Sequence, residues 1–143
     1  EMGHVAGSEL DGRTIPYDAS LDGLVSKKKD FIGKRSLSRA AFIKPDREKI
    51  VGVVPIDKTT SIPEGSYIVK DPNAKLPNPK LGHVSASCWS VEHDNPFSLA
   101  IIKDGKNMIG QKLFAMSPLK NKTIPVEIVS SHYVDPEGKR VRS

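Results

Sequence analysis

The sequence predicts a mainly β protein: a six-stranded antiparallel barrel of Greek-key or jelly-roll type, preceded by a short α-containing segment. Ten of the eleven prolines lie at or after Pro45, and six short apolar segments follow one another there without a helical pattern between them. Turn residues separate these segments, and such a series of strands closes into a barrel or packs as a sandwich. The predicted strands are residues 50–56, 66–71, 81–87, 97–103, 111–116 and 123–129.

The first and last predicted strands carry the clearest β pattern. The stretch "IVGVVPI", residues 50–56, is short, apolar and rich in β-branched residues. In "TIPVEIV", residues 123–129, the side chains of Ile124, Val126 and Ile128 share one face because strands have a period of two residues. Pro125 has no N–H to donate, so this strand is predicted to lie at a sheet edge or to be interrupted.

Turn chemistry separates the six strands. The connecting stretches read "PEG", "DPNAKLPNP", "DNP", "KDGKN" and "SPLKNK" in chain order. Each contains the Gly, Pro, Asn, Asp or Ser residues that tight turns favour. The connections therefore suit hairpins rather than crossover helices.

The residues before the barrel read differently and are predicted to be the trailing segment of another domain. Residues 1–45 form this segment, and residues 46–143 form the C-terminal barrel domain. Asp30 is a suitable N-cap for a helix over residues 31–42 that Pro45 ends, and residues 18–24 add a further turn. This segment cannot build a sizeable core by itself, so it is predicted to be looser than the barrel.

Composition narrows the possible partners and compartment. The chain has 143 residues and a formal net charge of +5, which permits a polyanionic partner but is more commonly a solvated basic surface. Eight thinly spread aromatics argue against nucleic-acid binding, which needs rings interleaved with basic strands. The single cysteine predicts a reducing, cytoplasmic compartment. There is no apolar run of membrane-spanning length and no signal peptide. The chain opens on Glu1, as a piece of a longer protein would.

The motifs of several enzyme classes are missing from the sequence. There is no GxGxxG, no GxxxxGK[ST] and no GxSxG, and the four histidines lack the spacing of a metal pair. We therefore expect neither a catalytic residue nor a metal site in this chain. Cys88 and Trp89 lie in "SASCWS", a run of small residues around one large ring. This pattern predicts a Trp89 that is largely buried or packed under a loop, beside an unreactive Cys88.

Several stretches in order nevertheless carry a family resemblance. "GSELDGRTIPYDASL" follows "EMG", and "DFIGKRSL", "LGHVSASCWS", "SLAII" and "DPEGKR" come later. Together they resemble the aminomethyltransferase family, which includes the T-protein of the glycine cleavage system. The "DPEGKR" ending resembles the branch formed by the alpha subunits of heterotetrameric sarcosine oxidases. The resemblance covers nearly the whole chain and places "DFIGKRSL" at the edge of a folate-binding domain, just before the barrel.

The resemblance implies a folate site that this chain completes only in part. Glu1 matches the family glutamate whose carboxylate accepts hydrogen bonds from the pterin ring, and Lys29 matches a basic residue that pairs with the folate tail. The chain departs from the family in three ways. Lysine stands where some T-proteins have arginine, which removes bidentate pairing. The spacing from Glu1 to Gly7 is about one residue short. The place of a tyrosine near the C-terminus of some T-proteins falls at Gly138 or Lys139.

By resemblance, the parent protein oxidises an amine and passes a one-carbon unit to tetrahydrofolate. Flavin and NAD belong to the parent complex but not to this segment. The expected partners are the remainder of the alpha subunit, the other oxidase subunits and folate. Binding to a membrane is not expected. Alone, the chain is expected to be inactive. A T-protein-like or dimethylglycine dehydrogenase-like fragment, a non-enzymatic interaction barrel and a weak polyanion binder remain as alternatives.

Overall fold

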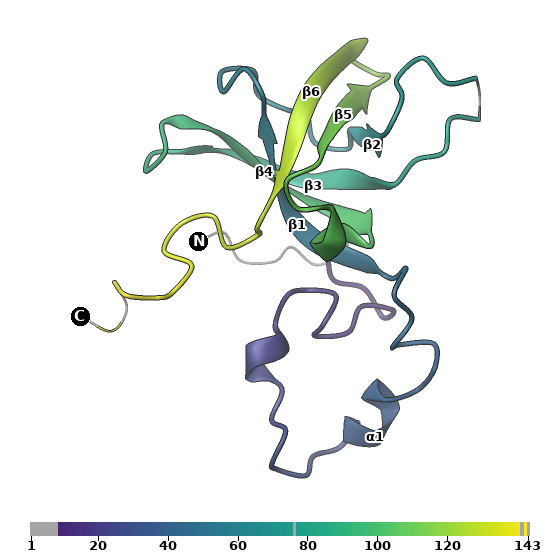
Figure 1. Cartoon of the computed structure of the whole chain (residues 1–143), viewed down its shortest axis with the longest axis vertical. Helices are drawn as coiled ribbons and strands as arrows, with labels where there is room; N and C mark the ends of the chain where they lie inside the picture. The colour runs from purple at the N-terminus through teal and green to yellow at the C-terminus, as the bar shows by residue number, and fades with distance from the viewer. Residues whose placement is uncertain (1–8, 76, 141, 143) are drawn as a thin grey trace.

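The computed structural model of the protein describes residues 9–75, 77–140 and 142. Six strands close into one antiparallel barrel in the order β1-β4-β3-β2-β5-β6, with β6 paired back to β1 (Figure 1). The six predicted strands are therefore confirmed. Their bounds are β1 Glu48–Pro55, β2 Tyr67–Val69, β3 Gly82–Ser90, β4 Asn95–Lys103, β5 Lys112–Ser117 and β6 Lys122–Val129.

The strand order is that of a Greek key. β2, β3 and β4 are consecutive neighbours, and β1 returns to lie beside β4. In a Greek key, three consecutive strands are neighbours and a fourth lies beside the one of the three that is most distant from it along the chain. A further hairpin, β5–β6, closes the ring between β2 and β1. The predicted fold class, a mainly β Greek-key barrel after a short α-containing segment, is confirmed.

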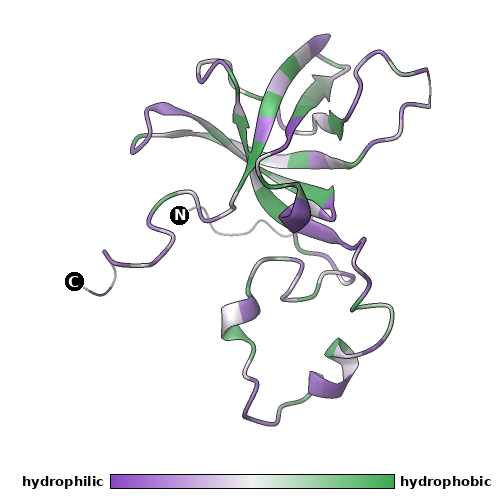
Figure 2. Ribbon diagram, in the orientation of Figure 1, coloured by the Kyte–Doolittle hydropathy of each residue, from purple (hydrophilic) through white to green (hydrophobic). Residues whose placement is uncertain are grey.

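The barrel interior is filled by aliphatic side chains from all six strands and from one loop. Figure 2 shows apolar residues concentrated along the strands, with polar residues in the connections. Burying one such side chain contributes about 1.5–3 kcal/mol, so the interior dominates the stability of the fold. This core consists of Val51, Val53, Ile62, Ile68, Val84, Ala100, Ile102, Leu113, Ala115, Ile124, Val126 and Ile128.

A second, smaller apolar cluster lies apart from this core. Ile50, Phe97 and Leu99 are buried together, with Cys88 and Tyr133 packed against them. Ile50 alternates with Val51 along β1, so the two side chains point to opposite faces of the strand. Because Val51 belongs to the barrel interior, Ile50 and its cluster lie on the outer face.

The last strand lies inside the closed ring, so its predicted edge position is wrong. Pro125 is tolerated because of where it falls along β6. The ladder between β1 and β6 ends at the pair Pro55–Val126, and the Pro125 carbonyl accepts a bond from Ile56 N one residue further on. The N–H and C=O of one strand residue point to the same side. The missing donor of Pro125 therefore faces the end of β1 and interrupts no ladder bond.

The predicted helix over residues 31–42 is much shorter. α1 spans only Lys34–Leu37, and its N-cap is Gly33 rather than Asp30. Gly33 has φ of 94°, a left-handed conformation that breaks any helix running through it. Beyond the helix, Ser38 Oγ donates to the Arg35 carbonyl, a local bond that competes with helix propagation.

The predicted turn over residues 18–24 is also reduced. Only Asp22–Leu24 is helical, as the single 3₁₀ turn η1. Asp18 lies outside it and uses its carboxylate in a tertiary contact described below. A second 3₁₀ turn, η2 (Gly105–Met108), joins β4 to β5.

Residues 21–44 form a wide loop beside the barrel, carrying η1 and α1 (Figure 1). None of their side chains is buried. Among the large apolar side chains of this loop, Ile32 is fully exposed and Leu24 is 81% exposed. Residues 9–20, by contrast, contact the barrel. The division of the chain into two domains at residue 45 stays a prediction.

Amide exchange is expected to separate these regions. Backbone amides of residues 51–54 should exchange only on global opening, because they lie in the closed ladder over the main core. Amides of residues 21–44 should exchange orders of magnitude faster, since no buried side chain holds them. Hydrogen-exchange mass spectrometry measures both in one sample. Equal protection of the two regions would contradict the prediction.

Candidate functional site

Lys29, the predicted partner of the folate tail, lies in the exposed turn between η1 and α1. Ser26 Oγ accepts a hydrogen bond from Lys29 N at 3.0 Å. The ammonium of Lys34 donates to the carbonyl oxygens of Lys29 at 2.7 Å and Lys27 at 3.4 Å. The turn is thus held by its own side chains, and an exposed ammonium on it suits a carboxylate ligand. Glu1, the predicted pterin partner, lies outside the described residues.

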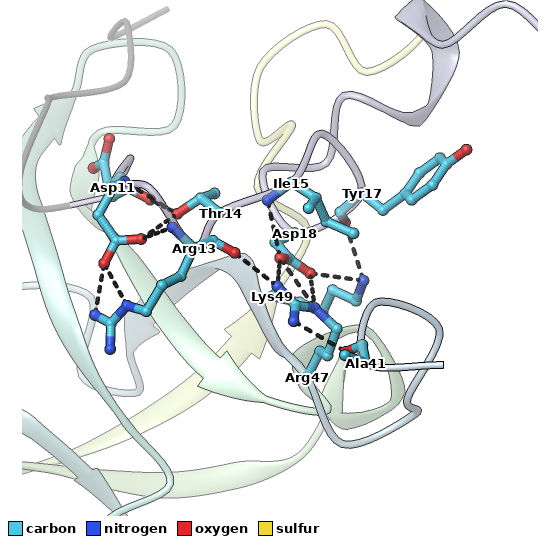
Figure 3. A network of polar contacts seen from close by, with 10 residues as sticks. Asp11, Arg13, Thr14, Ile15, Tyr17, Asp18, Ala41, Arg47 and Lys49 are labelled. Atoms are coloured by element: carbon cyan, nitrogen blue, oxygen red, sulfur yellow. Dashed lines mark hydrogen bonds and ion pairs between the residues drawn. The ribbon is translucent and has the colours of Figure 1, made fainter. Parts of the chain in front are cut away.

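Asp18 is the most heavily bonded carboxylate in the described structure (Figure 3). Its side chain is only 8% exposed and forms ion pairs with Arg47 and Lys49. Arg47 Nε donates to Oδ1 at 3.0 Å, Lys49 Nζ to Oδ1 at 3.2 Å and Ile15 N to Oδ2 at 3.1 Å. Burial raises its pKa, but the hydrogen bonds from Arg47, Ile15 and Lys49 together outweigh burial and lower it. Asp18 is therefore a fixed structural anion rather than a proton donor.

Arg47 also binds two other parts of the N-terminal segment, at residues 13 and 41. Its Nη2 donates to the Arg13 carbonyl at 3.0 Å, and its Nη1 donates to the Ala41 carbonyl at 3.3 Å. Its guanidinium carbon lies 5.3 Å from the centre of the Phe42 ring, within cation–π range. One side chain at the start of the barrel domain thus fastens the strands to residues 13, 18 and 41.

Residues 9–14, which belong to the family motif "GSELDGRT", also attach the N-terminal segment to the barrel. Glu9 is 5% exposed, and the hydroxyl of Ser85 on β3 donates to its carboxylate at 2.8 Å. Asp11 accepts a hydrogen bond from Arg13 N at 2.8 Å, and hydrogen bonds from Arg13 are the main cause that lowers its pKa to about 2. Asp11 N in turn donates to the Thr14 hydroxyl at 3.1 Å. The motif builds a turn and ties it to the barrel.

An apolar depression of about 550 Å³ lies on the outer face of the barrel, beside the outer cluster. We name it the Trp89 groove. It joins three parts of the chain: the N-terminal segment, the β3–β4 hairpin and the tail after β6. Its lining residues are Ala19, Leu21, Cys88, Trp89, Ser90, Val91, Glu92, Phe97, Leu99, Ser131, His132, Tyr133 and Val134.

The prediction that Trp89 is buried is wrong. Its side chain is 53% exposed, and the neighbouring Cys88 is partly buried. Trp89 pairs with Pro96 near the end of the β3–β4 hairpin, where the strands run on towards the turn. The small residues around Trp89 do not cover the ring, because their side chains are too short to reach over it. The reactivity of Cys88 stays a prediction.

The tail after β6 forms one wall of the groove, and it is held by Tyr133. The Tyr133 ring stacks on Phe97 with centroids 4.6 Å apart and planes at 11°. Its hydroxyl accepts a hydrogen bond from Asn95 Nδ2 at 3.1 Å, and its carbonyl lies 3.1 Å from a ring nitrogen of His93. The sequence did not predict a role for Tyr133, because the family resemblance points to the position at Gly138 or Lys139.

The motif "DPEGKR" holds the end of that tail. The carboxylate of Asp135 accepts hydrogen bonds from the backbone N–H of Lys139 and of Arg140, both at 2.9 Å. Gly138 has φ of 62°, which lets the turn close. Arg140 then forms an ion pair with Glu92 of the β3–β4 hairpin. The motif therefore folds the tail back onto the hairpin.

Neither a cluster of metal-binding side chains nor a membrane-spanning helix is found among the described residues. No three His, Cys, Asp or Glu side chains among them are placed to hold a metal ion. None of their helices is long and apolar enough to cross a membrane.

Comparison with known proteins identifies the relatives of this chain. It is 34% identical to the sarcosine oxidase subunit alpha of Rhizobium meliloti over 99% of its own length, and 36% identical to that of Corynebacterium sp. (strain P-1) over 95%. An aminomethyltransferase of Synechococcus sp. is 29% identical over 88% of the chain. The chain spans 14% of the length of either oxidase subunit and 32% of the aminomethyltransferase. No family model matches the chain.

A solved structure shares the fold. The glycine cleavage system aminomethyltransferase T from Bartonella henselae superposes with a TM-score of 0.65 over 90% of this chain and 34% of that one, at 21% identity. The resemblance noted in the sequence is thereby confirmed. The chain is thus similar in sequence, along nearly its whole length, to sarcosine oxidase alpha subunits, of which it fits the C-terminal part, and it shares the fold of an aminomethyltransferase.

Proposed function

We propose that this chain is the C-terminal part of a folate-dependent sarcosine oxidase alpha subunit. The parent protein oxidatively demethylates sarcosine in the cytoplasm and transfers the one-carbon unit to tetrahydrofolate. The observation that carries the proposal is the 34% identity to a sarcosine oxidase alpha subunit along 99% of the chain. The shared fold of an aminomethyltransferase supports it independently.

In this proposal the barrel, residues 46–143, closes over one side of the folate site, and residues 1–45 complete the folate-binding domain. Tetrahydrofolate, when bound, supplies the nitrogen atoms that accept the one-carbon unit. Lys29 pairs with the carboxylates of its tail, and the exposed, preformed turn that carries Lys29 fits that task. Glu1 binds the pterin ring. In this proposal the slot for the pterin ring lies in the preceding part of the parent.

The rest of the chemistry lies outside this chain. Flavin and NAD bind elsewhere in the parent complex, whose other subunits are the further partners. An aminomethyltransferase of the glycine cleavage type is the second candidate, supported by the 29% identity to such a protein. The two candidates differ in flavin: the purified parent complex carries bound flavin only if it is an oxidase, which its absorption spectrum tests.

The isolated chain is expected to bind tetrahydrofolate no better than roughly millimolar. Two charge-assisted contacts, one from Glu1 and one from the exposed Lys29, contribute about 1.5 kcal/mol each. Together they contribute about 3 kcal/mol, which does not offset the cost of association of at least about 4 kcal/mol. Calorimetric titration of this chain and of the complete parent subunit provides the measurement, and the parent should bind far more tightly.

Substitutions in the parent subunit test the two named residues. Lys29→Ala and Glu1→Gln should each weaken binding about tenfold, as the loss of one charge-assisted contact predicts. Lys120→Ala removes another exposed lysine, at the β5–β6 turn, and should leave affinity unchanged. Micromolar binding to the isolated chain would show that the barrel itself carries the site and that the proposed division of labour is wrong.

A further inference from the structure

The Trp89 groove has no role in the proposed folate site, and its features are those of a covered surface. Trp89 is 53% exposed and Val91 is 89% exposed on one hairpin. Apolar side chains gathered at one place on a surface, with polar groups at the rim, mark an interaction site. The lining of the groove also contains the polar residues Ser90, Glu92, Ser131 and His132.

The walls of the groove are fixed before any partner arrives. The tail is held to the hairpin by the stack of Tyr133 on Phe97 and by the ion pair of Arg140 with Glu92. The floor rests on the buried outer cluster of Ile50, Phe97 and Leu99. A preformed surface loses little conformational entropy on binding, so a partner can dock on it without rearranging the barrel.

The groove is continuous with the loop of residues 21–44. Leu21 lines the groove and begins that loop. Leu24 and Ile32 in the loop are 81% and 104% exposed, and Ile43 is 65% exposed. A body that covered both the groove and these side chains would extend well beyond the groove. Such a body is larger than a small molecule, which would fill the groove but leave the loop bare.

We propose that the Trp89 groove is the docking site for the preceding part of the parent polypeptide. That part inserts an apolar ridge, of leucine, methionine or aromatic side chains, against Trp89 and Val91. The inference rests on the proposed function, which makes this chain a part of a longer subunit. The relatives support the choice of occupant, since this chain spans only 14% of their length and most of each polypeptide is available to cover the groove.

Hydroxyl-radical footprinting read by peptide mass tests this directly. The oxidation rate of Trp89 is measured in the isolated 143-residue chain and in the full-length parent subunit. It should fall at least about fivefold in the parent, because the core of an interface excludes solvent. Leu119, fully exposed at the β5–β6 turn, serves as the internal control and should react equally in both.

A pair of variants separates docking from general shielding. Val91→Glu puts a charge into the groove, whereas Leu119→Glu puts the same charge at a distant exposed position. Both side chains are almost fully exposed, so neither variant should change the thermal midpoint of the isolated chain. In the parent, Val91→Glu should restore rapid oxidation of Trp89, and Leu119→Glu should not.

The outcomes also separate this inference from the proposed function. If the parent binds tetrahydrofolate but Trp89 reacts as fast as in the isolated chain, the groove is not the docking site and the proposed function stands. If Trp89 is protected but the parent does not bind folate, the assignment of the groove as a docking site stands and the proposed function is wrong. Protection of Trp89 in the isolated chain that grows with its concentration would assign the groove to a second copy and overturn the inference.

Discussion

Replacing Gly82 by alanine is expected to destabilise the barrel by about 3 kcal/mol or more, a large share of the stability of a domain of this size. A Cβ at this position would lie 1.9 Å from the carbonyl oxygen of Ile101 and 2.8 Å from the Ile102 Cα. Both atoms are backbone of β4, which is paired with β3 at this register. The clash therefore cannot be relieved by a side-chain rotation, and the two strands must separate.

Gly23→Ala is the matched control for Gly82→Ala. A Cβ at Gly23 meets nothing within 4 Å, and this glycine lies in the exposed turn η1. The same chemical change should therefore alter stability by no more than about 0.5 kcal/mol. Urea unfolding followed by circular dichroism measures both variants. A Gly82→Ala protein as stable as Gly23→Ala would show that the β3–β4 contact is looser than described.

The second large effect is expected from Asp18→Asn, with a loss of about 3 kcal/mol at neutral pH. The amide keeps the shape of the carboxylate but removes its charge, so Arg47 and Lys49 lose the partner that compensates their partial burial. The variant should also release residues 13–20 from the barrel, because Arg47 bonds both Asp18 and the Arg13 carbonyl. Faster amide exchange in residues 13–20 than in the wild type would report that release.

The effect of Asp18 should depend on pH in a defined direction. Its pKa in the folded chain is lowered from the usual 3.8, so the folded state binds the proton less readily than the unfolded state. The stabilisation is fully present above about pH 4 and is lost as the pH falls through the lower, folded pKa. The stability gap between wild type and Asp18→Asn should therefore narrow in acid. A gap that is constant from pH 7 to pH 2 would contradict this account.

Asp11→Asn is the control for the charge itself. Asp11 also pairs with an arginine, but the Arg13 side chain is 92% exposed and that of Asp11 is 39% exposed. Solvent and salt screen such a pair, so its loss should change stability far less than the loss of Asp18. If both aspartates had equal effects, burial would not be the cause.

The strands were readable from the sequence because their signals are local. The period of two at Ile124, Val126 and Ile128 and the turn residues between segments depend only on neighbours along the chain, and all six strands formed where predicted. The helix over residues 31–42 failed for an equally local reason, the left-handed conformation at Gly33, but "DFIGKRSL" does not reveal whether that glycine continues the helix or breaks it.

The partners of polar residues were not readable in the same way. Asp18 and Arg47 are 29 residues apart, and Glu9 and Ser85 are 76 apart, so no spacing rule connects them. The motifs "GSELDGRT" and "DPEGKR" pointed to a family without showing that residues 9–14 and 135–140 contact the barrel and its β3–β4 hairpin. The exposure of Trp89 depended on where the hairpin and the tail run relative to each other.

The sequence by itself therefore determined the number, order and approximate bounds of the strands, the barrel class and the family resemblance, since periodicity, turn chemistry and motif order are properties of the linear chain. Only the tertiary structure decided how the ring closes, why Pro125 fits inside it, which carboxylate anchors the N-terminal segment, and that Trp89 faces outward. Each of these depends on contacts between residues far apart in sequence, where backbone geometry and burial choose the partner.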